Sequence, residues 1–185
     1  RFRDLVPINR HYNGTLRIVM GKGLSYFMVY SLVSVYILCV VPWLFSLNQI
    51  AIPGVLTLFT LPYLAACIFF AMTASIAIRN RETCMLLFVF TSALLFLSGI
   101  SWPGAAMPAF WKYFSYIFPS TFGINGYVRI NSMGATLNEV SFEYQALWIQ
   151  TGFYFITTCL VYRWQILQSR KHVIEEYKKH KSIEA

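Results

Sequence analysis

The chain has 185 residues, of which 57% are hydrophobic, 18% are aromatic and only 12% are charged. Soluble domains carry roughly a quarter charged residues, so this composition excludes an ordinary soluble domain. No Lys, Arg, Asp, Glu or His occurs from position 23 to position 78. This stretch has room for two membrane helices of about 20 residues each. The sequence therefore predicts an all-α integral membrane protein.

The apolar runs divide this single membrane domain into four predicted transmembrane helices. Pro42 and Pro62 fall inside the first two, where each removes a helical hydrogen bond and is expected to kink the helix. The chain opens on Arg1 rather than Met, so we expect a piece of a longer chain, or a chain shown without its start. In chain order the predicted elements are an entry segment at 1–22, three spans within 23–100 (24–45, 55–78 and 84–100), an outer segment at 101–143, a last span at 144–162 and a tail at 163–185.

Basic residues fall almost entirely on one side of this predicted topology. Every Lys and Arg except Lys112 and Arg129 lies in the entry segment, in the short loop at 79–82 or in the tail. Because cytoplasmic loops carry an excess of Lys and Arg, both ends of the chain are predicted to be cytoplasmic.

The outer segment is apolar and yet rich in helix-breaking residues. A fifth span at 113–128 is rejected, since it is short, contains proline and glycines, and would move the basic tail to the outside. Non-helical backbone at membrane depth is tolerated only where protein or a water-filled cavity supports it. The sequence therefore predicts a re-entrant or interfacial segment between the third and fourth spans, with short helices near 107–117 and 120–130.

Prolines and glycines in and before this segment, together with a few neighbouring residues, form a candidate outer gate. Each proline fixes φ and sets a corner, and the glycines are expected to permit tight or left-handed backbone. The alternative is a surface helix that lies flat at the membrane interface and has no role in passage. The candidate gate residues are Ser98, Gly99, Pro103, Met107, Pro108, Trp111, Pro119, Gly123 and Gly126.

The predicted spans contain no ionisable side chain. Ion-coupled carriers and proton pumps place such groups inside the membrane, so energy for transport is expected to come from outside the bilayer. The motifs GxxxxGK[ST], HExxH and GxSxG are absent, so the chain is not expected to be an enzyme. No metal-ligand spacing is found among the widely separated cysteines, and no metal site is predicted.

A run of motifs then resembles a known family. In order they are Ser98-Gly99, Trp102-Pro103, Met107-Pro108, Pro119, Gly126, Arg129 and Gly134-Ala135, and upstream "NGTLRIVMGKGLSYFMVYSL" contains Gly14, Gly21 and Lys22. This pattern is similar to the C-terminal portion of type-2 ABC exporter permeases, nearest to a drug-exporter-like branch in Gram-negative bacteria. The resemblance implies spans three to six of a six-span subunit, without the first two spans and a large outer domain.

The resemblance also implies partners and a location. Such a permease works as a dimer in the bacterial inner membrane with two ATP-hydrolysing subunits, and a periplasmic adaptor is a further candidate partner. ATP and Mg²⁺ would be bound by the ATPase, and this chain would bind no cofactor and no nucleic acid. Two alternatives are kept, an integral membrane lipid-modifying enzyme and a membrane scaffold without transport.

The entry segment is where an ATPase would contact the permease. Leu16, Val19, Met20 and Leu24 share one predicted helical face, and the resemblance implies docking in a groove of the ATPase. An interfacial helix anchored on the membrane by its basic residues is an equally weighted alternative. The candidate coupling residues are Arg10, Leu16, Arg17, Val19, Met20 and Lys22.

Overall fold

The computed structural model describes residues 14–47, 49–75 and 107–183, with four two-residue pieces between 82 and 92. In the last helix, side chains are described up to residue 165. Every element in these ranges is helical, which confirms the predicted all-α class. The elements are α1 (Gly14–Val35), the π-helix η2 (Tyr36–Val40), α2 (Val41–Leu44), α3 (Pro53–Ala74), α5 (Ala109–Ser115), α6 (Pro119–Met133) and α7 (Ser141–Ile183).

Two helical stretches in the described residues are long and apolar enough to cross a membrane. One is the continuous rod of α1, η2 and α2, and the other is α3. They coincide with the first two predicted spans, although the first helix begins at Gly14, ten residues before the predicted span. The last predicted span, 144–162, lies inside α7. Most of the third, 84–100, lies outside the described residues.

A π-turn precedes Pro42 in the first rod. Proline has no N–H, so the carbonyl of Leu38, four residues earlier, lacks its α-helical donor. The side chain of Gln49 supplies one, because its Nε2 donates a 3.3 Å hydrogen bond to this carbonyl. The rod ends two residues after the proline, and Ser46 turns the chain with a φ of 49°.

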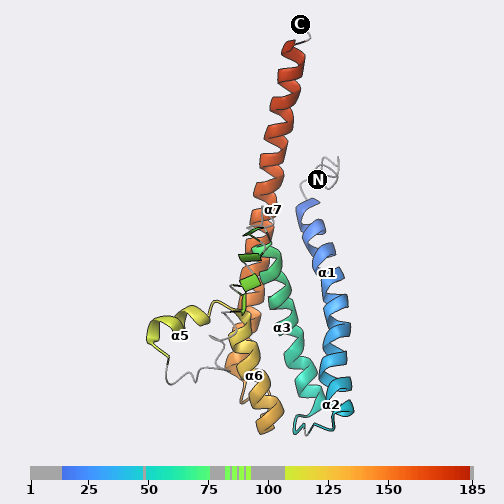
Figure 1. Ribbon diagram of the computed structural model, residues 1–185, viewed down its shortest axis with the longest axis vertical. Coiled ribbons are helices and arrows are strands. Elements are labelled where there is room, and N and C mark those ends of the chain that lie inside the picture. The colour runs from blue at the N-terminus through green and yellow to red at the C-terminus, as the bar shows by residue number, and fades with distance from the viewer. Residues whose placement is uncertain are drawn as a thin grey trace.

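The predicted outer segment contains the two short helices that the sequence predicts, α5 and α6. Pro108 is the N-cap of α5 and Pro119 is the first residue of α6, as expected for a residue that lacks an N–H and has a fixed φ. α6 ends at Gly134, whose φ of 66° forms the left-handed cap that favours glycine. Figure 1 shows α5 projecting to the side while α6 runs along the main bundle.

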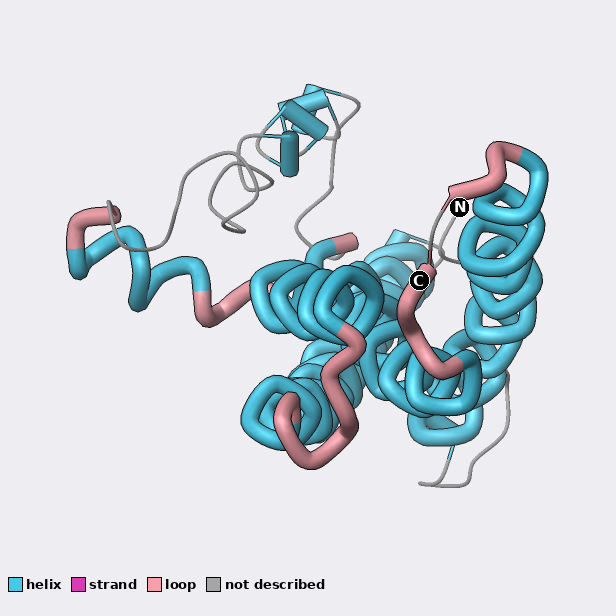
Figure 2. The backbone as a smooth tube through the Cα atoms, turned by 90° about the horizontal axis from the view of Figure 1, so that it is seen from below, coloured by secondary structure: helices cyan, strands magenta, loops and turns pink. Residues whose placement is uncertain are grey.

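α3 is the central helix, with contacts to α1, α6 and α7, and the packed helices are seen end-on in Figure 2. Its buried residues other than Pro62 belong to two clusters. The outer cluster joins α3 to α6 and α7 and contains Leu56, Phe59, Ala66, Phe122, Ile130, Val140 and Leu147. The inner cluster joins α3 to α1 and contains Val19, Ile68 and Met72.

Candidate functional site

The outer pair of helices is attached to α3 through two glycines on one face of α6. A Cβ added to Gly126 would lie 2.2 Å from Cζ of Phe59, and one added to Gly123 would lie 2.1 Å from Cε2 of Tyr63. Phe59 is only 2% exposed, so its ring has little space to move away. The two aromatic rings therefore rest directly on the backbone of α6.

These contacts correct one expectation from the sequence. Gly123 and Gly126 stand inside a helix, and among the described glycines only Gly134 has a positive φ. Of the two predicted alternatives, tight or left-handed backbone, the left-handed one is therefore excluded at Gly123 and Gly126. Close approach to the aromatic side chains of α3 is the physical reason that glycine fits both positions.

An ion pair connects α6 to the start of α7. Nη1 of Arg129 lies 2.7 Å from Oε1 of Glu143. The Glu143 side chain is 12% exposed and that of Arg129 is 42% exposed, so the pair lies at the edge of the packed region. A nearby backbone bond, 3.3 Å from the N–H of Ile50 to the carbonyl of Asn131, ties α6 to the loop before α3.

α7 also holds the corner between α5 and α6. Nε2 of Gln150 donates a 2.7 Å hydrogen bond to the carbonyl of Tyr116, and the hydroxyl of Tyr154 donates to the carbonyl of Ile117. Within the corner, Oγ1 of Thr121 donates to the carbonyl of Ser115 at 2.7 Å. These bonds satisfy carbonyls that the end of α5 leaves without helical donors, and they fix the path of the chain from α5 into α6.

The predicted gate residues thus separate into three groups. Pro119, Gly123 and Gly126 are buried together where α6 meets the bundle. Met107, Pro108 and Trp111 lie on or beside α5, where the side chain of Trp111 is half exposed. The remaining residues, Ser98, Gly99 and Pro103, lie outside the described residues.

The entry segment forms the first turns of α1. Val19 is fully buried against α3, whereas Leu16 and Met20 are more than half exposed. The predicted face that combined all three is therefore divided between the bundle and the surroundings. Arg17 is exposed, Lys22 is half-buried with its Nζ 5.3 Å from the centre of the Tyr162 ring, and Arg10 lies outside the described residues.

A family model described as ABC-2 family transporter protein matches residues 13–160. The chain belongs to this family. It is therefore a membrane-embedded permease of an ABC transporter, a transport subunit that is not itself catalytic. No curated protein and no solved structure shows significant similarity to the chain.

The seam between α3 and α7 of this permease contains polar residues that were not predicted from the sequence. Oγ1 of Thr158 lies 2.8 Å from Oγ1 of Thr73 and 3.3 Å from the carbonyl of Phe69. Nearer the start of α7, Thr151 donates a 3.3 Å hydrogen bond to the carbonyl of Pro62. Hydrogen bonds between membrane helices are each worth about 0.6 kcal/mol on average, so the seam is held mainly by packing, with the threonines setting the register.

The spacing of residues in α7 could have predicted which face of this helix packs in the seam. The buried positions of α7 recur every three or four residues, as expected for one face of a helix. This face includes polar side chains whose partners are invisible in the sequence. The buried residues are Glu143, Leu147, Thr151, Tyr154 and Thr158.

Proposed function

We propose that this permease is the membrane subunit of an ATP-driven exporter that moves a hydrophobic or amphipathic substrate out of the cytoplasm or the inner leaflet. A separate ATPase, with its ATP and Mg²⁺, supplies the energy, and a second permease copy completes the path. The family supports this proposal because its members normally work as dimers with an ABC ATPase. The drug-exporter-like branch and the bacterial inner membrane are proposed from the sequence motifs alone.

We also propose four spans with both ends in the cytoplasm, and an α5–α6 pair that enters the outer leaflet and turns back. The basic residues at both ends support this orientation. The corner prolines of α5 and α6, and the exposed aromatic side chains of α5, support an outer segment that lies in the membrane without crossing it.

The continuity of α1 is the observation that carries the proposed coupling to ATP hydrolysis. One helix runs from Gly14 to Val35 without a break, so its first turns move together with the span. A separate helix lying flat on the membrane would need a bend at this point. Val19 fixes the first turns to α3, while Leu16, Arg17 and Met20 remain exposed for contact with an ATPase.

α3 then provides a direct physical link from the entry segment to the proposed gate. Its inner part contacts Val19 through Ile68 and Met72, and its outer part contacts Gly126 through Phe59. A displacement of the entry turns would therefore reach α6 through packed side chains on a single helix. Such a chain of contacts carries energetic coupling only if both ends bias the same motion, which makes the link testable.

The test of coupling is Leu16→Asp in the complete transporter. A carboxylate placed in an apolar contact loses hydration without gaining a partner, so we expect roughly tenfold weaker ATPase binding, equivalent to about 1.4 kcal/mol. Permease-dependent ATP turnover and export should fall together, while membrane insertion stays normal. Co-purification with the ATPase and ATP turnover in liposomes measure both effects.

The matched control is Leu47→Asp, which changes an exposed leucine in the loop between α2 and α3. This loop lies at the opposite end of the first rod, so the change should leave ATPase binding intact. Unchanged binding and unchanged export in the Leu16→Asp transporter would remove the coupling role of the entry segment.

A further inference from the structure

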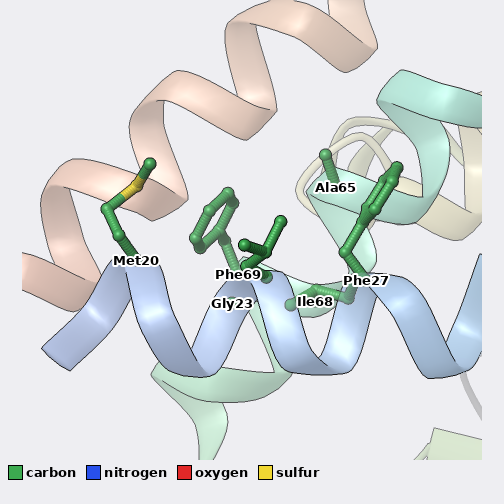
Figure 3. Close-up of a pocket in the computed structure, with 7 residues that line it drawn as sticks. Met20, Gly23, Phe27, Ala65, Ile68 and Phe69 are labelled. Carbon is green, nitrogen blue, oxygen red and sulfur yellow. The ribbon is translucent and has the colours of Figure 1, made fainter. Parts of the chain in front are cut away.

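Two hollows lie beside the contact between α1 and α3, and their chemistry differs. One is an apolar groove of about 150 Å³ bordered by Met20, Phe27, Ala65 and Phe69 (Figure 3). Acyl chains of a bilayer are enough to fill it. The other is a partly open cavity of about 250 Å³ between α1, α3 and α7, and its lining is partly polar.

Hydroxyl groups gather at this second cavity. Tyr26 and Tyr30 border it from consecutive turns of α1, Tyr162 from α7, and Ser75 from the end of α3. Among the described residues, no hydrogen bond is made by the hydroxyls of Tyr26 and Tyr30. These hydroxyls are therefore available to a ligand that enters from the side.

Positive charge lies at the edge of the same cavity. Nζ of Lys22 is 5.3 Å from the centre of the Tyr162 ring, which forms part of the lining. Arg17 is exposed on the preceding turns of α1, and none of the described residues that line the cavity is acidic. The local field therefore favours an anion.

The position of the cavity along the bundle matches the headgroup level of a bilayer. Lys22 is the last charged residue before the uncharged stretch from 23 to 78, so it marks the boundary between polar and apolar chain. Tyr162 marks the corresponding boundary in α7, because Arg163 follows it directly. Tyrosine and lysine side chains at such a boundary place their polar ends among the headgroups.

We propose that this cavity binds an anionic phospholipid of the leaflet in which Lys22 lies. The phosphate accepts hydrogen bonds from the ammonium of Lys22 and from the tyrosine hydroxyls, as in other basic pockets between membrane helices. The volume is below the roughly 300 Å³ of the smallest complete ligand pockets. It therefore takes the phosphate and glycerol of the lipid, and the acyl chains stay in the bilayer beside α1.

The proposal is tested by a photo-reactive residue in the full-length permease in cells. p-Benzoylphenylalanine replaces Tyr26, while Lys22 and Tyr30 keep their proposed contacts to the phosphate, and in a parallel protein it replaces Met28, which is exposed on the opposite side of α1. After irradiation and purification, mass spectrometry identifies the adducts. We expect anionic phospholipid adducts to be enriched at position 26 relative to position 28, which samples the bulk bilayer.

Two further variants examine the contacts themselves. Lys22→Gln should lower the yield of anionic adducts at position 26 about fivefold, as expected for one basic residue near a charged membrane. Ala71→Phe, which fills the cavity, should lower it as well. Ala65→Phe is the matched control, since it fills the apolar groove on the other side and should leave the yield unchanged.

The proposal is overturned if positions 26 and 28 give the same lipid composition. It is also overturned if the adduct at position 26 is a protein, whether a second permease copy or an ATPase. The proposal is also overturned if Lys22→Gln and Ala71→Phe both leave the yield of anionic lipid adducts at position 26 unchanged, provided that both proteins insert and purify normally. None of these measurements uses transport, so their failure would leave the proposed export role intact.

Discussion

α6 and α1 both approach α3 through a glycine that faces an aromatic ring, but the two contacts differ in tightness. At the outer contact, an added Cβ on Gly126 would lie 2.2 Å from Phe59, which is far inside any real contact distance. At the inner contact, an added Cβ on Gly23 would lie 3.3 Å from Phe69. The inner contact also has a hollow on each side, whereas the outer one is continuous with the larger buried cluster.

This difference indicates which helix can move. Packing rather than expulsion of water holds membrane helices together, so a contact without free space resists displacement more than one flanked by hollows. α6 should therefore follow α3 as one body, while α1 can shift against α3 by small amounts. A permease that receives force at α1 and uses it at α6 would need this asymmetry.

The largest expected effect comes from breaking the tight contact with Gly126→Leu. Because Phe59 is buried, the new side chain must push α6 away from α3, which costs about 1–3 kcal/mol or more. The thermal midpoint of the purified permease should fall, and export should be reduced while insertion stays normal. Adding Phe59→Ala to Gly126→Leu removes the opposing ring and should recover part of the lost stability.

Gly152→Leu is the matched control for this variant, since nothing lies within 4 Å of a Cβ at that position on α7. If Gly126→Leu and Gly152→Leu have the same thermal midpoint and the same export activity, α6 is not tightly attached to α3 and the proposed gate is wrong.

A smaller effect is expected at the ion pair that connects α6 to α7. Removing Arg129 or Glu143 by alanine substitution should each destabilise the outer region, and a double-mutant cycle should give a coupling of about 1 kcal/mol. The partial exposure of Arg129 keeps the value low. Chemical denaturation in detergent measures the cycle, and a coupling near zero would show that solvent screens the pair.

The loose contact between α1 and α3 should tolerate an added methyl group. Gly23→Ala places its methyl group 3.3 Å from the edge of the Phe69 ring, which can shift into the neighbouring groove. The gain in helix propensity, about 1 kcal/mol in a helix interior, offsets the crowding. We expect the free energy of unfolding of Gly23→Ala to lie within about 0.5 kcal/mol of the wild-type value. Gly21→Ala is the uncrowded control, because a Cβ at that position meets nothing within 4 Å. A loss as large as that of Gly126→Leu would erase the contrast between the two contacts.

The smallest effect concerns Glu139, in the turn before α7. The N–H and hydroxyl of Thr136 donate to its Oε2 at 2.7 and 3.0 Å, and these bonds lower the pKa of Glu139 below its ordinary value of 4.5. A lowered folded-state pKa adds stability above the unfolded-state pKa, and this stability is lost as pH falls through the folded-state value. Thr136→Ala should therefore weaken the acid dependence of thermal unfolding below pH 4.5. Identical acid profiles for the two proteins would contradict it.

The parts of the fold that follow from local rules could be predicted from the sequence. Long uncharged runs predicted α1 and α3, and the prolines that begin α5 and α6 predicted the bounds of these two helices within a few residues. The division of the entry segment could not be predicted, because only the position of α3 decides that Val19 turns inward and Leu16 outward. The same limit applies to Thr158, whose partner Thr73 lies on another helix. For Gly126 the need for glycine could be predicted, but its cause, close approach to Phe59, required the neighbouring helix.

The length of α7 has a mechanical consequence. Its 43 residues form a rod of about 65 Å at the usual helical rise, whereas the hydrocarbon core of a bilayer is about 30 Å thick. In the proposed four-span topology, even a strongly tilted α7 has more than a third of its length past the lipid, and its upper turns extend past the other helices in Figure 1. The distal turns therefore act as a spacer of fixed length. A label or a binding protein at these turns would stand off from the membrane by a set distance, and a small rotation of the buried half would become a wide lateral sweep at its tip.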